Sequence, residues 1–227
     1  MAARGAAIGR GWAGSLTMGA GQFCTNPGIA VVRADQAGIV AEAARDALAG
    51  TGAQVMLTEG IAQAYRAGRD RVANVPGVRE VLTSMCNQRE ATPFLFVVSG
   101  RDWLGNHALG EEVFGPLGLI VTAETEAEMI EIARSFEGQL TATLHMDAGD
   151  ADLARRLMPI LERKAGQVLA NGFPTGVEVC EAMVHGGPYP ASINFGATSV
   201  GTMAIRRFLR PVCYQNIPDE ILPEDLR

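Results

Sequence analysis

The sequence predicts an α/β fold, with a mostly parallel sheet flanked by helices. Two observations predict it. Short apolar runs rich in β-branched residues alternate with stretches of helical periodicity along most of the chain. The helical stretches are about four turns long, which suits crossover connections between parallel strands. A sheet connected in this way is covered by helices on both faces.

The first elements follow in order from these patterns. Residues 2–18 carry apolar side chains at helical spacing, and the pattern breaks at Gly19. Residues 29–33 are a short β-branched run and predict a strand. We expect Asp35 to cap the next helix, which runs to about Leu48.

The middle of the chain repeats the alternation. A helix is expected over about 59–73, and buried strands over 93–98 and 117–122. The next helix should begin at a capping box formed by Thr125 and Glu128, in which each side chain satisfies the other residue's backbone N–H.

The last regular elements lie before residue 171. The helix begun at Thr125 should close at Gly138, and residues 140–145 should form a strand. Residues 149–164 are expected to form a helix that ends at Gly166, with a strand over 167–170. Beyond it, residues rich in Gly and Pro predict an ordered loop near a site, followed by an exposed tail.

Composition excludes several classes of function. The chain has 19 basic and 25 acidic residues, a net charge of -6, and no run of Lys or Arg, so nucleic acid and anionic membranes are poor partners. Three dispersed histidines suggest no metal site. Four cysteines without a C-x-x-C pair suggest no disulfide framework. With no secretory signal and no long apolar run, we expect a protein of the cytoplasm.

One cysteine lies in a turn-rich stretch between a predicted helix and a predicted strand, Gly19-Ala20-Gly21-Gln22-Phe23-Cys24-Thr25-Asn26-Pro27-Gly28. This position leaves the sulfur of Cys24 accessible and lets backbone N–H groups point at whatever the sulfur attacks. A thiolate is the reactive form of cysteine, so an activating environment is needed. From the residues alone, a small buried thiol is the commoner use of a single cysteine.

A second segment precedes an apolar strand and reads Glu111-Glu112-Val113-Phe114-Gly115-Pro116. Taken alone, it predicts a solvated loop at the entry to that strand. Taken with the first segment, it indicates more. G-Q-x-C followed by E-E-V-F-G-P resembles the aldehyde dehydrogenase superfamily. Residues 171–180, 185–190, 198–202 and 208–215 are similar to the branch that oxidises 2-oxoglutarate semialdehyde.

The resemblance implies a role for three residues. Cys24 matches the catalytic cysteine, which attacks the aldehyde carbon and passes through a thiohemiacetal to a thioester, with its own N–H as one donor to the oxyanion. Glu112 matches the residue that holds the nicotinamide-side ribose, and Phe114 the aromatic residue near that end of the cofactor. The implied cofactor is NAD or NADP, and the implied partners are a small aldehyde and further copies of the chain.

The resemblance also implies a domain plan and an incomplete catalyst. Residues 1–203 correspond to the family's catalytic domain and residues 204–227 to a C-terminal tail with a candidate oligomerisation strand. No acid precedes Cys24, and no G-x-G-x-x-G fingerprint occurs after a strand. The family's general-base glutamate and dinucleotide region are therefore not expected in this chain, which alone should be inactive. The alternative is a non-catalytic assembly or binding domain derived from the family.

Smaller signals have simpler interpretations. His185 precedes Gly186-Gly187-Pro188, and support of a turn is favoured over a role as an acid or base. The other cysteines are interpreted as structural thiols. An arginine near the C-terminus would suit a substrate carboxylate, although a subunit contact or a solvated face is favoured. These residues are Cys86, Cys180 and Cys213, and Arg206, Arg207 and Arg210.

Overall fold

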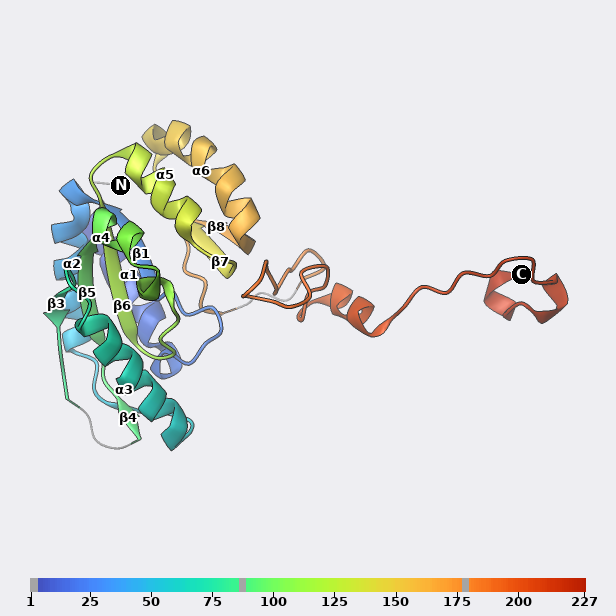
Figure 1. Ribbon diagram of the computed structural model, residues 1–227, viewed down its shortest axis with the longest axis horizontal. Helices are drawn as coiled ribbons and strands as arrows, with labels where there is room; N and C mark the ends of the chain where they lie inside the picture. Colours follow the sequence, from blue (N-terminus) through green and yellow to red (C-terminus); the bar gives the residue numbers. More distant parts are fainter. Residues whose placement is uncertain (1–3, 86–88, 177–179) are drawn as a thin grey trace.

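The computed structural model describes residues 4–85, 89–176 and 180–227, and a four-stranded sheet lies at its centre (Figure 1). The strand order is β1-β6-β5-β3. The first three strands are parallel, and the edge strand β3 is antiparallel to β5. This confirms the predicted mostly parallel sheet. The strands are β1 (Ile29–Arg33), β6 (Leu117–Ala123), β5 (Phe94–Ser99) and β3 (Arg79–Leu82).

Both faces of this sheet are buried, as the continuous apolar runs predict. Leu95 and Ile120 point to one face, where they pack with Trp12 of α1 (Gly5–Thr17) and with α2 (Ala34–Ala49). Phe96 and Leu119 point to the other face, which α3 (Glu59–Ala73) and α4 (Gly100–Gly105) cover. Neighbouring residues of a strand point to opposite faces, so each strand contributes to both cores.

Two smaller sheets stand apart from the central one in hydrogen bonding. The parallel strands β7 (Gln139–Leu144) and β8 (Ala165–Ala170) are connected through η4 (Ala148–Asp150) and α6 (Ala151–Lys164). Helix α5 (Glu126–Ser135) packs beside α6 around Ile130, Ala133 and Leu157 (Figure 1). The third sheet is a short antiparallel pair, β2 (Gln54–Val55) and β4 (Glu90–Ala91).

Two helix starts differ in detail from the sequence predictions. Asp35 does not cap α2, because it lies inside the first turn and its carboxylate pairs with Arg33, 3.2 Å away. Thr125 does cap α5 and accepts a hydrogen bond from the N–H of Glu128 at 3.1 Å. The Glu128 carboxylate, however, accepts from the N–H of Glu124 at 2.7 Å, one residue before the predicted partner. The capping box is therefore half confirmed.

The prediction that Gly166 ends α6 is wrong, because Gly166 is the second residue of β8. Because Gly166 has no side chain, the backbone of Gly186 can pack directly against it. A Cβ built there would collide with the backbone oxygen of Gly186. At Gly138 a Cβ would meet the backbone of Pro188, and at Gly187 the oxygen of Gln139. Glycines therefore let residues 186–188 lie directly against the beginnings of β7 and β8.

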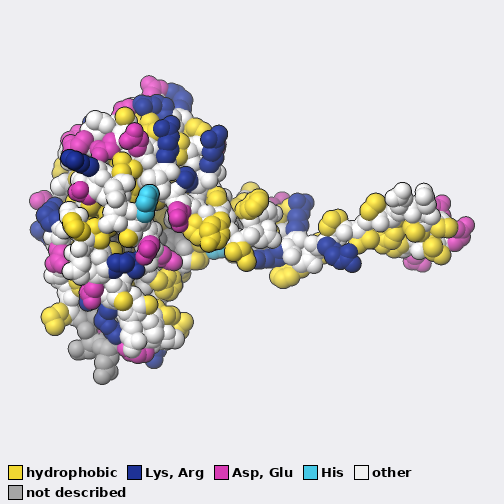
Figure 2. Space-filling view, in the orientation of Figure 1, with side chains coloured by type: hydrophobic (Ala, Val, Ile, Leu, Met, Phe, Trp, Pro, Cys, Tyr) yellow, Lys and Arg dark blue, Asp and Glu magenta, His cyan; other side chains and the backbone are white. Residues whose placement is uncertain are grey.

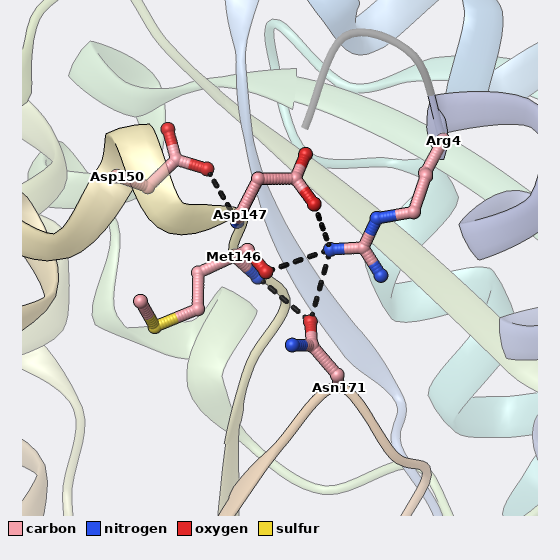
Figure 3. A network of polar contacts seen from close by, with 5 residues as sticks. All are labelled: Arg4, Met146, Asp147, Asp150 and Asn171. Carbon is pink, nitrogen blue, oxygen red and sulfur yellow. Dashed lines mark hydrogen bonds and ion pairs between the residues drawn. The ribbon is translucent and has the colours of Figure 1, made fainter.

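Arg4 ties the start of α1 to the carboxyl ends of β7 and β8 (Figure 3). Its Nη2 donates to the oxygen of Met146 at 2.7 Å and to Asn171 Oδ1 at 3.1 Å, and lies 2.7 Å from the Asp147 carboxylate. Asn171 Oδ1 also accepts from the N–H of Met146 at 2.9 Å. The small sheet and the helix that leads to Cys24 are thus held together.

The chain beyond residue 201 leaves the body of the protein as an extended, exposed segment (Figure 1). It contains only the short helices η5 (Thr202–Phe208), η6 (Asp219–Ile221) and η7 (Glu224–Leu226). Hydrophobic side chains are exposed along it (Figure 2); the larger ones are Ile205, Phe208, Leu209, Val212, Tyr214, Ile217, Ile221 and Leu226. Across the described residues, every helix is too short or too polar to cross a membrane.

His145 gives this fold a dependence on pH. Its ring lies against Phe173, with ring centroids 4.8 Å apart. Burial, and then the charge of Arg4, lowers the pKa of His145 below its ordinary value of 6.5. Below that value the unfolded chain binds more protons than the folded one. The free energy of unfolding should therefore fall as pH decreases from about 6.5 and should be level above it.

We expect His145→Phe to remove most of this slope, because phenylalanine can keep the ring contact but cannot bind a proton. Urea denaturation between mildly acidic and neutral pH measures it. His107→Gln is the matched control, since His107 is exposed. An unchanged slope in His145→Phe would show that another group is responsible.

Candidate active site

Cys24 is an exposed residue of the loop between η2 (Met18–Gly21) and β1. Hydrogen bonds fix the backbone of this loop, although the thiol itself is exposed. Within the described residues, the N–H of Cys24 has no hydrogen-bond acceptor. Three hydrogen bonds hold the loop: Trp12 Nε1 to the oxygen of Pro27 at 2.5 Å, Asn26 Nδ2 to the oxygen of Leu16 at 2.8 Å, and Thr25 Oγ1 to the oxygen of Pro174 at 2.9 Å.

The turn before this loop uses left-handed backbone at three consecutive residues. The φ angles are 56° at Gly19, 59° at Ala20 and 68° at Gly21. Glycine adopts this region readily, whereas alanine there is strained by about 1–2 kcal/mol. Ala20 is buried, so packing stabilises it in this conformation. The turn redirects the chain from the end of α1 to the Cys24 loop.

Gly21 brings the two sequence segments of interest together. A Cβ at Gly21 would meet the carbonyl carbon and oxygen of Gly115 and the nitrogen of Pro116. The Cys24 loop and the loop over residues 111–116 therefore lie backbone against backbone. Each loop precedes one of the neighbouring parallel strands β1 and β6, so both lie at the amino edge of the sheet.

The second loop presents its acids to solvent. Glu111 pairs with Arg71, with 3.3 Å between Nη2 and the carboxylate. Glu112 is exposed, and Phe114 is half-buried. Within the described residues no hydrogen bond or ion pair joins Cys24 to Glu112, so the loops are neighbours without a direct polar contact between these side chains.

His185 lies beside Cys24, which the sequence alone did not predict. Its Nε2 is 3.3 Å from Cys24 Sγ. The expected turn is not found at His185, whose backbone instead pairs with a segment 13–14 residues further along the chain. The N–H donates to Thr198 Oγ1 at 2.8 Å, and the carbonyl oxygen accepts from the N–H and hydroxyl of Ser199 at 3.0 and 2.9 Å. The imidazole is left to contact the thiol.

The remaining candidates lie elsewhere. Cys180 and Cys213 are exposed free thiols, so their interpretation as packed structural thiols is wrong, and Cys86 is outside the described residues. The three arginines of the tail are exposed. Among the described residues no group of three or more His, Cys, Asp or Glu side chains is placed to hold a metal ion.

We expect Gly21→Ala to destabilise the protein by about 2–4 kcal/mol, because the new Cβ combines overpacking with a left-handed φ. It would push the Cys24 loop away from Gly115. Gly14→Ala is the matched control, since Gly14 is exposed on α1 with nothing within 4 Å of a built Cβ. That change should stabilise by about 0.5–1 kcal/mol. Urea unfolding compares the two, and equal stabilities would contradict the backbone contact.

Comparison with known proteins finds relatives that are semialdehyde dehydrogenases. It is 53% identical over 230 residues to alpha-ketoglutaric semialdehyde dehydrogenase 2 of Azospirillum brasilense, and 41% identical over 229 residues to alpha-ketoglutaric semialdehyde dehydrogenase of Acinetobacter baylyi. These matches cover 100% and 99% of the chain and 44% of each relative. The chain thus spans less than half the length of the curated relatives it matches. No model of a known protein family matches it.

Solved structures share the fold. Betaine aldehyde dehydrogenase of Staphylococcus aureus, in a complex with NAD+, superimposes with a TM-score of 0.70 at 18% identity, over 88% of this chain and 41% of that one. Aldehyde dehydrogenase 21 of Physcomitrella patens, in complex with the reaction product succinate, gives 0.68 at 16% identity, over 82% and 39%. At these identities the likeness concerns the fold.

Proposed function

Because the chain belongs to the aldehyde dehydrogenase superfamily, we propose that it is the cysteine-bearing part of an NAD(P)-dependent dehydrogenase of a semialdehyde acid, such as 2-oxoglutarate semialdehyde. The observation that carries the proposal is the exposed thiol of Cys24 on a loop anchored by three hydrogen bonds. The substrate class rests on the 53% and 41% identity to two semialdehyde dehydrogenases.

In the proposed reaction Cys24 acts as the nucleophile. Its sulfur attacks the aldehyde carbon, and the electron pair of the carbonyl bond moves to the oxygen. The N–H of Cys24, which has no acceptor within the described residues, is available to donate to that oxygen. Because anchored backbone carries the thiol, little reorganisation is needed when charge develops on the substrate oxygen.

Glu112 and Phe114 are proposed to bind the cofactor. They lie on the loop that touches the Cys24 loop through Gly115 and Gly21. The Glu112 carboxylate is exposed and can therefore accept hydrogen bonds from ribose hydroxyls. The ion pair with Arg71 is made by the neighbouring Glu111 and not by Glu112. The residues present therefore fit one end of a nicotinamide nucleotide. When bound, NAD or NADP would supply the hydride acceptor.

Two further features belong to the proposal. The extended segment over residues 204–227 would serve oligomerisation, since exposed apolar side chains along it are typical of a surface that a partner covers.

The described cysteines are free thiols, which suits a reducing cytoplasm. A non-catalytic assembly domain is the alternative, and the exposed, anchored position of Cys24 favours the enzyme.

The experiment that tests the proposal joins this chain with the portion of the Azospirillum brasilense relative that it does not match. Reduced nicotinamide should form from 2-oxoglutarate semialdehyde when Cys24 is present and should not form with Cys24→Ala. Equal activity of the two proteins would contradict the proposal.

A further inference from the structure

We propose that His185 is the proton acceptor for the Cys24 thiol, so that the site holds a cysteine–histidine pair. The proposal rests on the function proposed above and adds a catalytic residue to it. Its first support is geometric: the sulfur and Nε2 are 3.3 Å apart, within hydrogen-bond reach of each other.

The second support is that the contact between residue 185 and residues 198–199 does not need an imidazole. Within the described residues, His185 makes this contact through its backbone alone, with Thr198 and Ser199 as partners. Any residue with a free N–H could make these bonds. Among the described residues, the one polar contact of the ring is with Cys24 Sγ, so a structural role leaves the choice of histidine unexplained.

The third support is that both halves of the pair are fixed independently. The Cys24 loop is anchored to α1 and to Pro174. Residues 186–188 lie against β7 and β8, where glycines permit backbone contact. The Arg4 network then joins α1 to the ends of β7 and β8 (Figure 3). The contact between thiol and imidazole therefore joins two anchored loops.

The chemical step is a proton transfer followed by addition. With its ring hydrogen on Nδ1, His185 accepts the thiol proton at Nε2. The thiolate then forms a bond to the aldehyde carbon, and the carbonyl electron pair moves to oxygen. The products are an oxyanion and an imidazolium ion, so charge and atoms balance. Cys24 is exposed and His185 partly exposed, so the proton can leave to solvent.

The test measures alkylation of Cys24 in the full 227-residue chain. Cys86, Cys180 and Cys213 are replaced by serine so that one thiol reports, and iodoacetamide is the probe at pH 7. A free thiol is only a few per cent thiolate at that pH, so His185→Ala should slow alkylation by about 10- to 30-fold. His185→Gln should be similarly slow, because an amide can hydrogen-bond but cannot take the proton.

Added imidazole should restore the rate of His185→Ala, which loss of a merely structural side chain would not allow. Two controls accompany it. His107→Ala should leave the rate of alkylation of Cys24 unchanged. In a second control, Cys180 is the one cysteine retained. Its alkylation rate should not change with His185→Ala, and added imidazole should change it no more than it changes the rate of a free thiol in solution. Circular dichroism and urea midpoints check that the variants are folded.

The outcomes separate the two proposals. If His185→Ala and His185→Gln alkylate as fast as the parent, the role of His185 is overturned while Cys24 can still be the nucleophile. If slow alkylation is not rescued by imidazole in a folded variant, the proton-transfer role is also overturned. Failure of the proposed function is a different result, namely dehydrogenase turnover that survives Cys24→Ala.

Discussion

The purified 227-residue chain alone should give no measurable oxidation of 2-oxoglutarate semialdehyde with NAD or NADP. The physical reason is that a nucleophile cannot replace a general base or a dinucleotide-binding site, and turnover requires both. The family's general-base glutamate, a group other than His185, is not expected in this chain, and loss of such a base typically costs about 10²–10⁴-fold in rate. A chain that matches 44% of its relatives' length and has no G-x-G-x-x-G fingerprint after a strand should also lack most of a dinucleotide site.

Accumulation of reduced nicotinamide measures this, with the intact Azospirillum brasilense relative assayed beside it. Adding the unmatched portion of that relative should restore turnover. Turnover by the chain alone near that of the intact relative would contradict the expectation and would mean that these residues build a complete site.

Cys24→Ala should abolish turnover of the joined protein, by about 10⁴-fold or more, as loss of a covalent nucleophile does in other enzymes. The thiol supplies the bond to the substrate carbon, and alanine offers no substitute. Stability should change little, because Cys24 is exposed and the anchoring bonds come from Trp12, Thr25 and Asn26.

Cys180→Ala is the matched control, since Cys180 is also an exposed free thiol. It should retain turnover. The assay is the formation of reduced nicotinamide, with unfolding curves for both variants. If Cys180→Ala loses activity and Cys24→Ala keeps it, the nucleophile has been assigned to the wrong cysteine.

Local sequence patterns predicted the regular elements well. The strand at 29–33 and the helix at 59–73 agree with the structure to the residue, because β-branched runs and helical periodicity are local properties. Element ends were less predictable. Asp35 was expected to cap α2, yet its carboxylate pairs with Arg33. Gly166 was expected to end a helix, yet it lies in β8, and a glycine is needed there because the backbone of Gly186 approaches too closely for a Cβ.

The candidate site was predictable only in part. The sequence singled out Cys24, Glu112 and Phe114 through a family resemblance, and the structure places their loops in contact through Gly21 and Gly115. For His185 a turn was favoured over an acid or base role, because the residue is 161 positions from Cys24 and no local pattern encodes their contact. One signal was available: a histidine beside a run of glycines and prolines that the sequence predicts to form an ordered loop near a site.

Acylation of Cys24 tests the central claim most directly. The full chain is treated with an activated ester, p-nitrophenyl acetate, and the peptides that carry Cys24, Cys180 and Cys213 are followed by mass spectrometry. The account predicts that the acetyl group appears first on Cys24, because that thiol lies on an anchored loop beside His185 Nε2. Acetylation of Cys24 no faster than of the other two exposed thiols would contradict it.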